Sequence, residues 1–118
     1  MFNASPTTEV SGLFENSRPL DLICMGRVAV DLYAEQVYSS LEDAQSFRKY
    51  LGGCAGNTAI GTARLGLKSA MFSCVGTDDM GVYLRKTLEN EGVDTSLLRN
   101  TPEHLTALVL LGVSPPDR

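Results

Sequence analysis

A glycine-rich turn between residues 52 and 57 is the part of this sequence best suited to hold a ligand. It reads Gly52-Gly53-Cys54-Ala55-Gly56-Asn57 and lies between a polar stretch at 42–50 and a run of small residues. Glycine tolerates a positive φ and lets a ligand approach the backbone, while the free N–H groups of a helix's first turn face whatever binds. Such a turn favours hydroxyl-rich or anionic ligands. The same glycines also suit a turn with no ligand, so the turn alone leaves both interpretations open.

Two acidic segments accompany the turn. Asp31 interrupts the apolar stretch 28–33, and Gly76-Thr77-Asp78-Asp79-Met80-Gly81 follows another apolar run. A carboxylate is costly to bury without a partner, so Asp31 lies at a surface or has a partner. A solvent-facing aspartate on a half-exposed strand fits the pattern equally well. Asp78 or Asp79 can cap the helix that follows.

The overall composition excludes several classes of protein. The chain has 118 residues, 43% of them hydrophobic, and a net charge of -4, which indicates one globular domain or a piece of one. Its basic residues are scattered, so we expect no nucleic-acid partner. Three cysteines without CxxC spacing and one histidine argue against a zinc site, and we expect Cys24 and Cys74 to be buried. No signal peptide is recognisable in residues 1–20, which predicts a cytoplasmic protein with no membrane partner.

Apolar runs that alternate with helical patterns predict an α/β fold with a mostly parallel sheet. We expect a flexible leader at 1–19, strands at 20–25, 69–75 and 105–113, and an extended segment at 28–33. A helix follows the glycine turn, with apolar residues spaced from 55 to 67, and Gly66 ends it. A second helix is capped by Asp78 or Asp79 and closed by Gly92. Ligands of such sheets bind at the carboxyl ends of the strands, so segments 26–31 and 76–79 fall on the ligand side. Segment 61–69 superficially resembles a phosphate-binding loop, but it runs from helix to strand, the reverse of what that motif needs.

Taken in order, three groups of residues resemble the N-terminal signature of the ribokinase-like (PfkB) carbohydrate kinases. They are Gly26 with Asp31, Leu51-Gly52-Gly53 with Asn57, and Val75-Gly76 with Asp78 and Gly81. The resemblance implies a ribokinase-like fold, a mostly parallel sheet with flanking helices and a small β lid, of which residues 20–118 are the incomplete N-terminal portion. Stretches 26–36 and 50–57 are most similar to the branch that phosphorylates a sugar acid of myo-inositol breakdown.

The resemblance implies substrate-binding roles for four residues. Asp31 would accept hydrogen bonds from sugar hydroxyls, Gly52 and Gly53 would let the backbone approach the sugar, and Asn57 would both donate and accept. The segment after Asp31 and the strand from residue 105 would form the lid over the sugar. In many relatives this lid also pairs with a second subunit, which implies a possible homodimer.

Arg27, beside the glycine turn, is a candidate counter-charge for a sugar-acid carboxylate, because its planar fork suits carboxylate recognition. A structural ion pair with an acidic residue is an equally good interpretation of Arg27. The ribokinase branch carries a lysine where Cys54 stands and an asparagine where Ala29 stands, so a ribose-type set of contacts is not expected.

The resemblance implies ATP and Mg²⁺ as cofactors, with binding residues mostly outside this chain. The family's Gly-Ala-Gly-Asp element, with its anion hole and catalytic aspartate, does not occur in the 118 residues. No catalytic residue and no metal ligand is therefore assigned, and the chain alone is expected to be inactive.

We interpret the chain as the N-terminal sugar-binding part of an ATP-dependent carbohydrate kinase, whether a fragment, a truncated reading frame or part of a longer protein. The alternative is a non-catalytic sugar-binding or interaction module. An α/β nucleotide binder is disfavoured because phosphate-binding fingerprints are missing.

Overall fold

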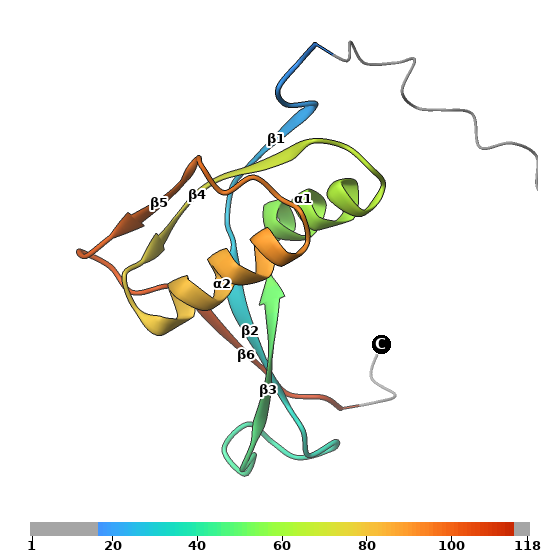
Figure 1. The fold of residues 1–118 in the computed structure, drawn as a ribbon. Coiled ribbons are helices and arrows are strands. Elements are labelled where there is room, and N and C mark those ends of the chain that lie inside the picture. The colour runs from blue at the N-terminus through green and yellow to red at the C-terminus, as the bar shows by residue number, and fades with distance from the viewer. Residues whose placement is uncertain (1–16, 115–118) are drawn as a thin grey trace, which may run out of the picture.

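A computed structural model describes residues 17–114 of the chain. The predicted leader at 1–19 falls mostly outside the described residues, and so does the proline pair at 115–116. In chain order the elements are β1 (Leu22–Met25), β2 (Ala29–Ala34), β3 (Phe47–Gly52), α1 (Cys54–Arg64), β4 (Ser69–Gly76), α2 (Asp79–Asn90), β5 (Leu98–Thr101) and β6 (Leu108–Leu111) (Figure 1).

Strands β1, β4 and β5 form a parallel sheet in the order β1-β4-β5, which confirms the predicted α/β fold. Short apolar runs suit such strands because helices bury them. Both helices pack on one face of this sheet. The core between them contains Cys24, Met71, Val75 and Leu98 from the strands and Ala59, Leu84 and Leu88 from the helices.

The opposite face of the parallel sheet is open within residues 17–114. Successive side chains of a strand alternate between its two faces, so Phe72 and Cys74 lie opposite the buried Met71 and Val75. Ile23, Met25 and Phe72 are 51%, 74% and 44% exposed. Cys74 is exposed as well, so the prediction that it is buried was wrong, whereas Cys24 is buried as predicted. The reason is that no described element covers the face that Cys74 shares with Phe72.

The ends of both helices follow local signals in the sequence. Helix α1 ends near Gly66, whose φ of +93° lies in the left-handed region that favours glycine. Gly92, with a φ of +80°, follows the end of α2 in the same way. Helix α2 begins after Asp78, whose carboxylate accepts hydrogen bonds from the backbone N–H groups of Met80 and Gly81, each at 3.0 Å. These ends agree with the prediction.

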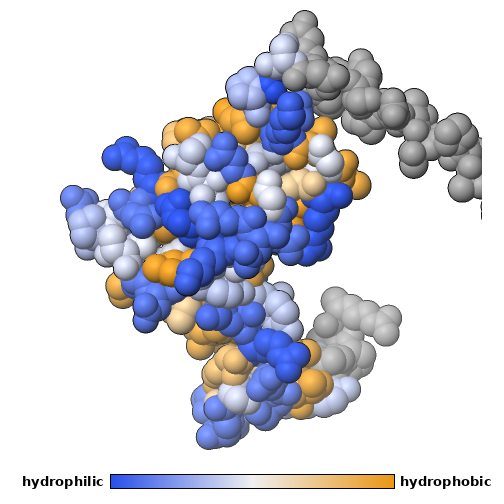
Figure 2. Space-filling model, viewed as in Figure 1, coloured by the Kyte–Doolittle hydropathy of each residue, from blue (hydrophilic) through white to orange (hydrophobic). Residues whose placement is uncertain are grey.

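Strands β3, β2 and β6 form a second sheet, which we call the lid. Strand β2 pairs antiparallel with β3 and parallel with β6, so that Asp31 lies between Tyr50 and Val109. Figure 1 shows these strands extending below the helices and the parallel sheet. Figure 2, in the same view, shows hydrophobic side chains mixed with hydrophilic ones over the lid. The predicted lid is therefore present.

Two strands were missing from the sequence-based prediction. Strand β3 begins within the polar stretch 42–50 and runs directly into the glycine turn. Its residues Arg48, Lys49 and Tyr50 are all exposed, so it lacks the alternation of buried and exposed positions that marks a half-buried strand. Strand β5 buries only Leu98 fully, which left segment 93–101 without a strand pattern. The last strand, β6, is shorter than the predicted 105–113.

Candidate functional site

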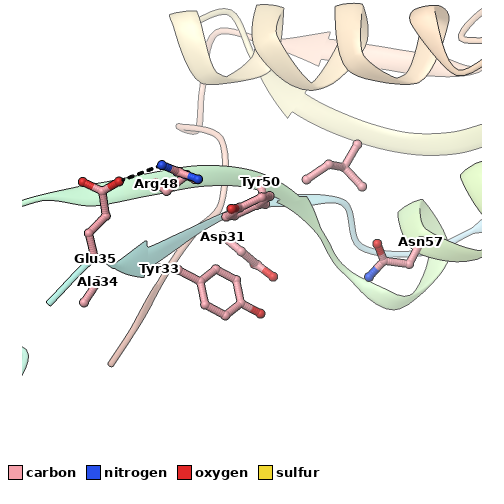
Figure 3. Close-up of a pocket in the computed structure, with 8 residues that line it drawn as sticks. Asp31, Tyr33, Ala34, Glu35, Arg48, Tyr50 and Asn57 are labelled. Atoms are coloured by element: carbon pink, nitrogen blue, oxygen red, sulfur yellow. Dashed lines mark ion pairs between the residues drawn. The ribbon is translucent and has the colours of Figure 1, made fainter. Parts of the chain in front are cut away.

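A hollow of ≈ 660 Å³ is bounded by the lid and the first turn of α1. Its lining residues are Asp31, Tyr33, Ala34, Glu35, Arg48, Tyr50, Leu51 and Asn57 (Figure 3). Its volume falls within the range of small-molecule sites. Because all but one of the lining residues come from β2, β3 and the segment between them, the lid supplies most of the wall.

The register of the lid brings polar and aromatic side chains to one face. Asp31 lies opposite Tyr50, and Tyr33 lies opposite Arg48, across the antiparallel pair of β2 and β3. Directly opposed residues of such a pair project on the same side. The rings of Tyr33 and Tyr50 meet edge to face, with centroids 5.5 Å apart and planes at 88°. The hollow therefore has an aromatic wall beside a carboxylate.

The Asp31 carboxylate occupies space that only a glycine at position 52 leaves free. A Cβ atom built on Gly52 would overlap the carboxyl carbon and both oxygens of Asp31. Asp31 is half-buried, and among the described residues no hydrogen bond or ion pair engages its carboxylate. This acceptor is positioned by packing and is available to a donor that enters the hollow.

Gly53 shapes the beginning of α1. Its φ is +93°, and a Cβ atom there would overlap the backbone oxygen of Arg27. No side chain caps the N-terminus of α1, and its first turn contains no acidic residue. Within the described part of the chain, no side-chain acceptor therefore engages the first N–H groups of the helix. Figure 3 shows the Asn57 amide extending from this turn on the side of the hollow where Asp31 lies.

A second carboxylate, that of Asp78, joins the lid to the parallel sheet. Besides capping α2, it accepts the backbone N–H of Thr106 at 2.8 Å, while the Thr106 hydroxyl accepts the N–H of Gly76 at 2.9 Å. The Thr106 N–H is the main cause of a lowered pKa at Asp78. Thr106 comes shortly before β6, so this network fixes the point where the chain enters the lid. Asp78 caps the start of α2, and neither Asp78 nor Thr106 lines the hollow, although segment 76–79 was expected on the ligand side of the sheet.

The described part of the chain contains neither a cluster of potential metal ligands nor a helix suited to span a membrane. Residues 17–114 contain no group of three or more His, Cys, Asp or Glu side chains that could hold a metal ion. Neither helix in that range combines the length and hydrophobicity that a membrane-spanning segment requires.

The model of the pfkB family carbohydrate kinases matches residues 20–118. The chain belongs to this family. It is similar to the 5-dehydro-2-deoxygluconokinase of Geobacillus kaustophilus, with 36% identity over 104 residues that cover 87% of this chain and 31% of the relative. It is also similar to the 5-dehydro-2-deoxygluconokinase of Clostridium tetani, with 43% identity over 83 residues, 70% of this chain and 24% of the relative.

Solved structures of sugar kinases agree with the fold. A PfkB protein from Polaromonas sp. JS666 is 39% identical, with a TM-score of 0.74 over 79% of this chain and 31% of the relative. A sugar kinase from Pyrococcus horikoshii, solved in complex with ATP, is 35% identical, with a TM-score of 0.73 over 75% of this chain and 29% of the relative. The expected ribokinase-like fold is confirmed. The chain spans roughly a third of the length of its curated relatives, 31% for the Geobacillus enzyme.

The hollow of this family member unites some of the predicted site residues. Asp31 and Asn57 line it, and Gly52 and Gly53 shape its edge by leaving room for Asp31 and for the backbone of Arg27. The side chain of Arg27 is exposed and is not among the lining residues.

Sequence reasoning missed Tyr33, Glu35, Arg48 and Tyr50. Tyr33 and Glu35 could have been found from their spacing, because residues two apart on an extended segment share a face with Asp31. Arg48 and Glu35 form an ion pair at 3.3 Å, with side chains 67% and 41% exposed. Contact with the Tyr50 side chain, followed by the charge of Glu35, raises the pKa of Arg48. The hollow therefore holds a permanent cation as well as carboxylates.

Proposed function

We propose that this chain is the substrate-binding part of an ATP-dependent carbohydrate kinase that phosphorylates 5-dehydro-2-deoxygluconate in myo-inositol breakdown. The observation that carries the proposal is the Asp31 carboxylate, which no hydrogen bond or ion pair engages among residues 17–114 and which lies against Gly52 in a hollow that Asn57 and the start of α1 also border. A polyhydroxylated ligand supplies the donors that such a carboxylate lacks.

Each proposed substrate-binding residue has a distinct task. Asp31 accepts hydrogen bonds from hydroxyl groups, and Asn57 donates and accepts through its amide. Gly52 keeps Asp31 in place, and Gly53 lets the sugar approach the backbone at the start of α1. The edge-to-face pair of Tyr33 and Tyr50 offers apolar surface to the C–H groups of a sugar ring or chain.

The choice of substrate is supported by the relatives. The proteins of Geobacillus kaustophilus and Clostridium tetani that match this chain are both named 5-dehydro-2-deoxygluconokinase. A neutral pentose is a weaker candidate, because Cys54 and Ala29 replace the lysine and asparagine of the ribokinase branch. A cytoplasmic location is proposed with this function.

ATP and Mg²⁺ are proposed as cofactors of the complete kinase. The relative from Pyrococcus horikoshii was solved with ATP. The described residues do not fit a metal ion, because no cluster of potential ligands exists among residues 17–114. No step of phosphoryl transfer is therefore assigned to these residues, and we propose that the chain alone transfers nothing. The residues for ATP would lie in the portion of the relatives that this chain does not span.

Titration calorimetry of the 118-residue chain with 5-dehydro-2-deoxygluconate and D-ribose tests the proposal, after circular dichroism has shown that the chain is folded. We expect binding of the sugar acid that is lost in Asp31→Ala and Asn57→Ala. A folded chain that binds neither sugar would contradict the proposal.

A chimeric enzyme distinguishes a chain that is part of a kinase from one that is a non-catalytic module. In it, this chain replaces the matching segment of the Geobacillus kaustophilus enzyme. Phosphorylation of the sugar acid that depends on Asp31 supports the kinase. A folded chimera that binds the sugar acid without phosphorylating it would favour the module.

The lid is also proposed to pair with the lid of a second copy. On the face opposite Asp31, Leu32 is half-buried, and Leu108 and Leu110 of β6 are 49% and 52% exposed. Burial of these leucines against a second copy would remove apolar surface from water. Sedimentation velocity should show a dimer that Leu110→Glu converts to a monomer. A dimer that survives this substitution would refute pairing through the lid.

A further inference from the structure

The hollow has a polar end at α1 and a charged end on the lid. Figure 3 shows Asn57 at one end, the ion pair of Arg48 and Glu35 at the other, and Asp31 between them. Arg48 sits opposite Tyr33 in the hairpin, so its side chain is on the same face of the lid as Asp31. Among the lining residues, Arg48 is the one cation. One part of a ligand that spans the hollow would contact Asn57 and Asp31, and another part would contact the Arg48 guanidinium.

The Arg48 guanidinium has donors to spare. Its ion pair with Glu35 is a single contact, from Nη2 to Oε1 at 3.3 Å, whereas a guanidinium carries five N–H donors. The two side chains are 67% and 41% exposed, and an exposed pair of this kind is weakly held. A second carboxylate can therefore join Glu35 at Arg48 or replace it without a large penalty.

The surroundings of Arg48 also suit carboxylate binding. Contact with Tyr50 favours its charged form, and at neutral pH arginine is protonated while a sugar acid is ionised. The planar fork matches both oxygens of a carboxylate, which a lysine at this position would not do.

We propose that Arg48 is the specificity-determining residue of the hollow. Its guanidinium binds the carboxylate of an acidic sugar, while Asp31 and Asn57 bind the hydroxyl groups of that sugar. The inference rests on the proposed function and adds how the site distinguishes an acid from a neutral sugar. It also gives Glu35 a role, because this carboxylate competes with the substrate for the same guanidinium. Arg27 becomes the control, since its side chain is exposed and does not line the hollow.

The test is calorimetric titration of the 118-residue chain with 5-dehydro-2-deoxygluconate and with the neutral ketose D-fructose. The variants are Arg48→Gln, Arg48→Lys, Glu35→Gln and Arg27→Gln, each checked by circular dichroism. We expect Arg48→Gln to weaken binding of the acid about tenfold or more, and binding of fructose less than twofold, because a charge-assisted hydrogen bond is lost only with the acid. Arg48→Lys should fall between, since it keeps the charge and loses the fork. Glu35→Gln should strengthen binding of the acid, and Arg27→Gln should leave it unchanged.

The outcomes separate this inference from the function on which it rests. If the chain binds both probes and Arg48→Gln weakens them equally or not at all, the role of Arg48 is overturned and the sugar site stands. If Arg27→Gln loses binding of the acid and Arg48→Gln does not, the role proposed for Arg48 is overturned and belongs to Arg27. A folded chain that binds neither probe overturns the proposed function together with this inference. Should Arg48→Gln fail to fold, a Glu35→Gln variant that binds the acid no better than the unsubstituted chain overturns it as well.

Discussion

The carboxylate of Asp31 lies against the α-carbon of Gly52, across the hairpin that joins β2 to β3. Gly52 itself pairs with Ala29, so Asp31 leans diagonally over the end of β3 towards the beginning of α1. The position of the acid is therefore set by the absence of a side chain on the neighbouring strand. This relation explains why a glycine is needed at position 52, where the backbone has no positive φ.

Substitution of Gly52 should separate ligand binding from folding. Gly52→Ala places a methyl group where the Asp31 carboxylate lies, so we expect a loss of stability of about 1–3 kcal/mol and at least a tenfold loss of sugar affinity. Gly61→Ala is the matched control, because a Cβ atom there meets nothing within 4 Å. It should stabilise the chain by about 0.5–1 kcal/mol through helix propensity and leave binding unchanged. Urea unfolding and calorimetry measure both quantities, and unchanged affinity in Gly52→Ala would contradict the account.

Gly53 and Gly66 share a φ of +93° but differ in surroundings. At Gly66 a Cβ atom meets open space, so Gly66→Ala should cost only the strain of the backbone, about 1 kcal/mol. At Gly53 the Cβ atom would also overlap the backbone oxygen of Arg27, which cannot move as a side chain would. We therefore expect Gly53→Ala to lower the free energy of unfolding more than Gly66→Ala does. Equal losses in urea titrations would show that the contact with Arg27 is relieved by a small shift.

Much of the fold was predictable because its signals are local. Gly66, Asp78 and Gly92 set helix ends through backbone conformation and capping, and the apolar runs of β1 and β4 indicate buried strands. Strand β3 escaped prediction because its exposed residues on the lid show neither periodicity nor burial. Cys74 was misplaced for a related reason, since an apolar run does not reveal that one face of the strand is left open.

The candidate site was predictable in part. The roles of Asp31 and Asn57 came from a resemblance in sequence, and the structure brings both to one hollow. Arg48, Tyr33 and Tyr50 reach the same hollow only through the cross-strand register of β2 and β3. Register depends on pairing between segments that are distant in sequence, so no local pattern around Arg48 could reveal which side chains it faces.

Asp78 should make the stability of the chain depend on pH in the acid range. Its pKa is lowered from 3.8, first by the Thr106 N–H and then by the N–H groups at the start of α2, so the folded state favours the charged form. The stabilisation is therefore fully present above the unfolded pKa and is lost as the pH falls through the folded pKa. Urea midpoints of the unsubstituted chain and Asp78→Asn should converge below about pH 4. Asp79→Asn, with the same change of charge but the Thr106 bond intact, should not reproduce this convergence, and a pH-independent difference for Asp78→Asn would contradict it.

The open face of the parallel sheet should make the isolated chain associate. Ile23, Met25 and Phe72 form a row of exposed apolar side chains on neighbouring strands, and no element of residues 17–114 covers them. Contiguous apolar surface of this kind, beside an unpaired strand edge at β1, favours contact with other copies. Phe72→Lys should reduce the larger species in sedimentation velocity. Val82→Lys, at a position that is also 44% exposed but lies on α2, should not. If both substitutions act equally, the effect comes from net charge and the face plays no special part.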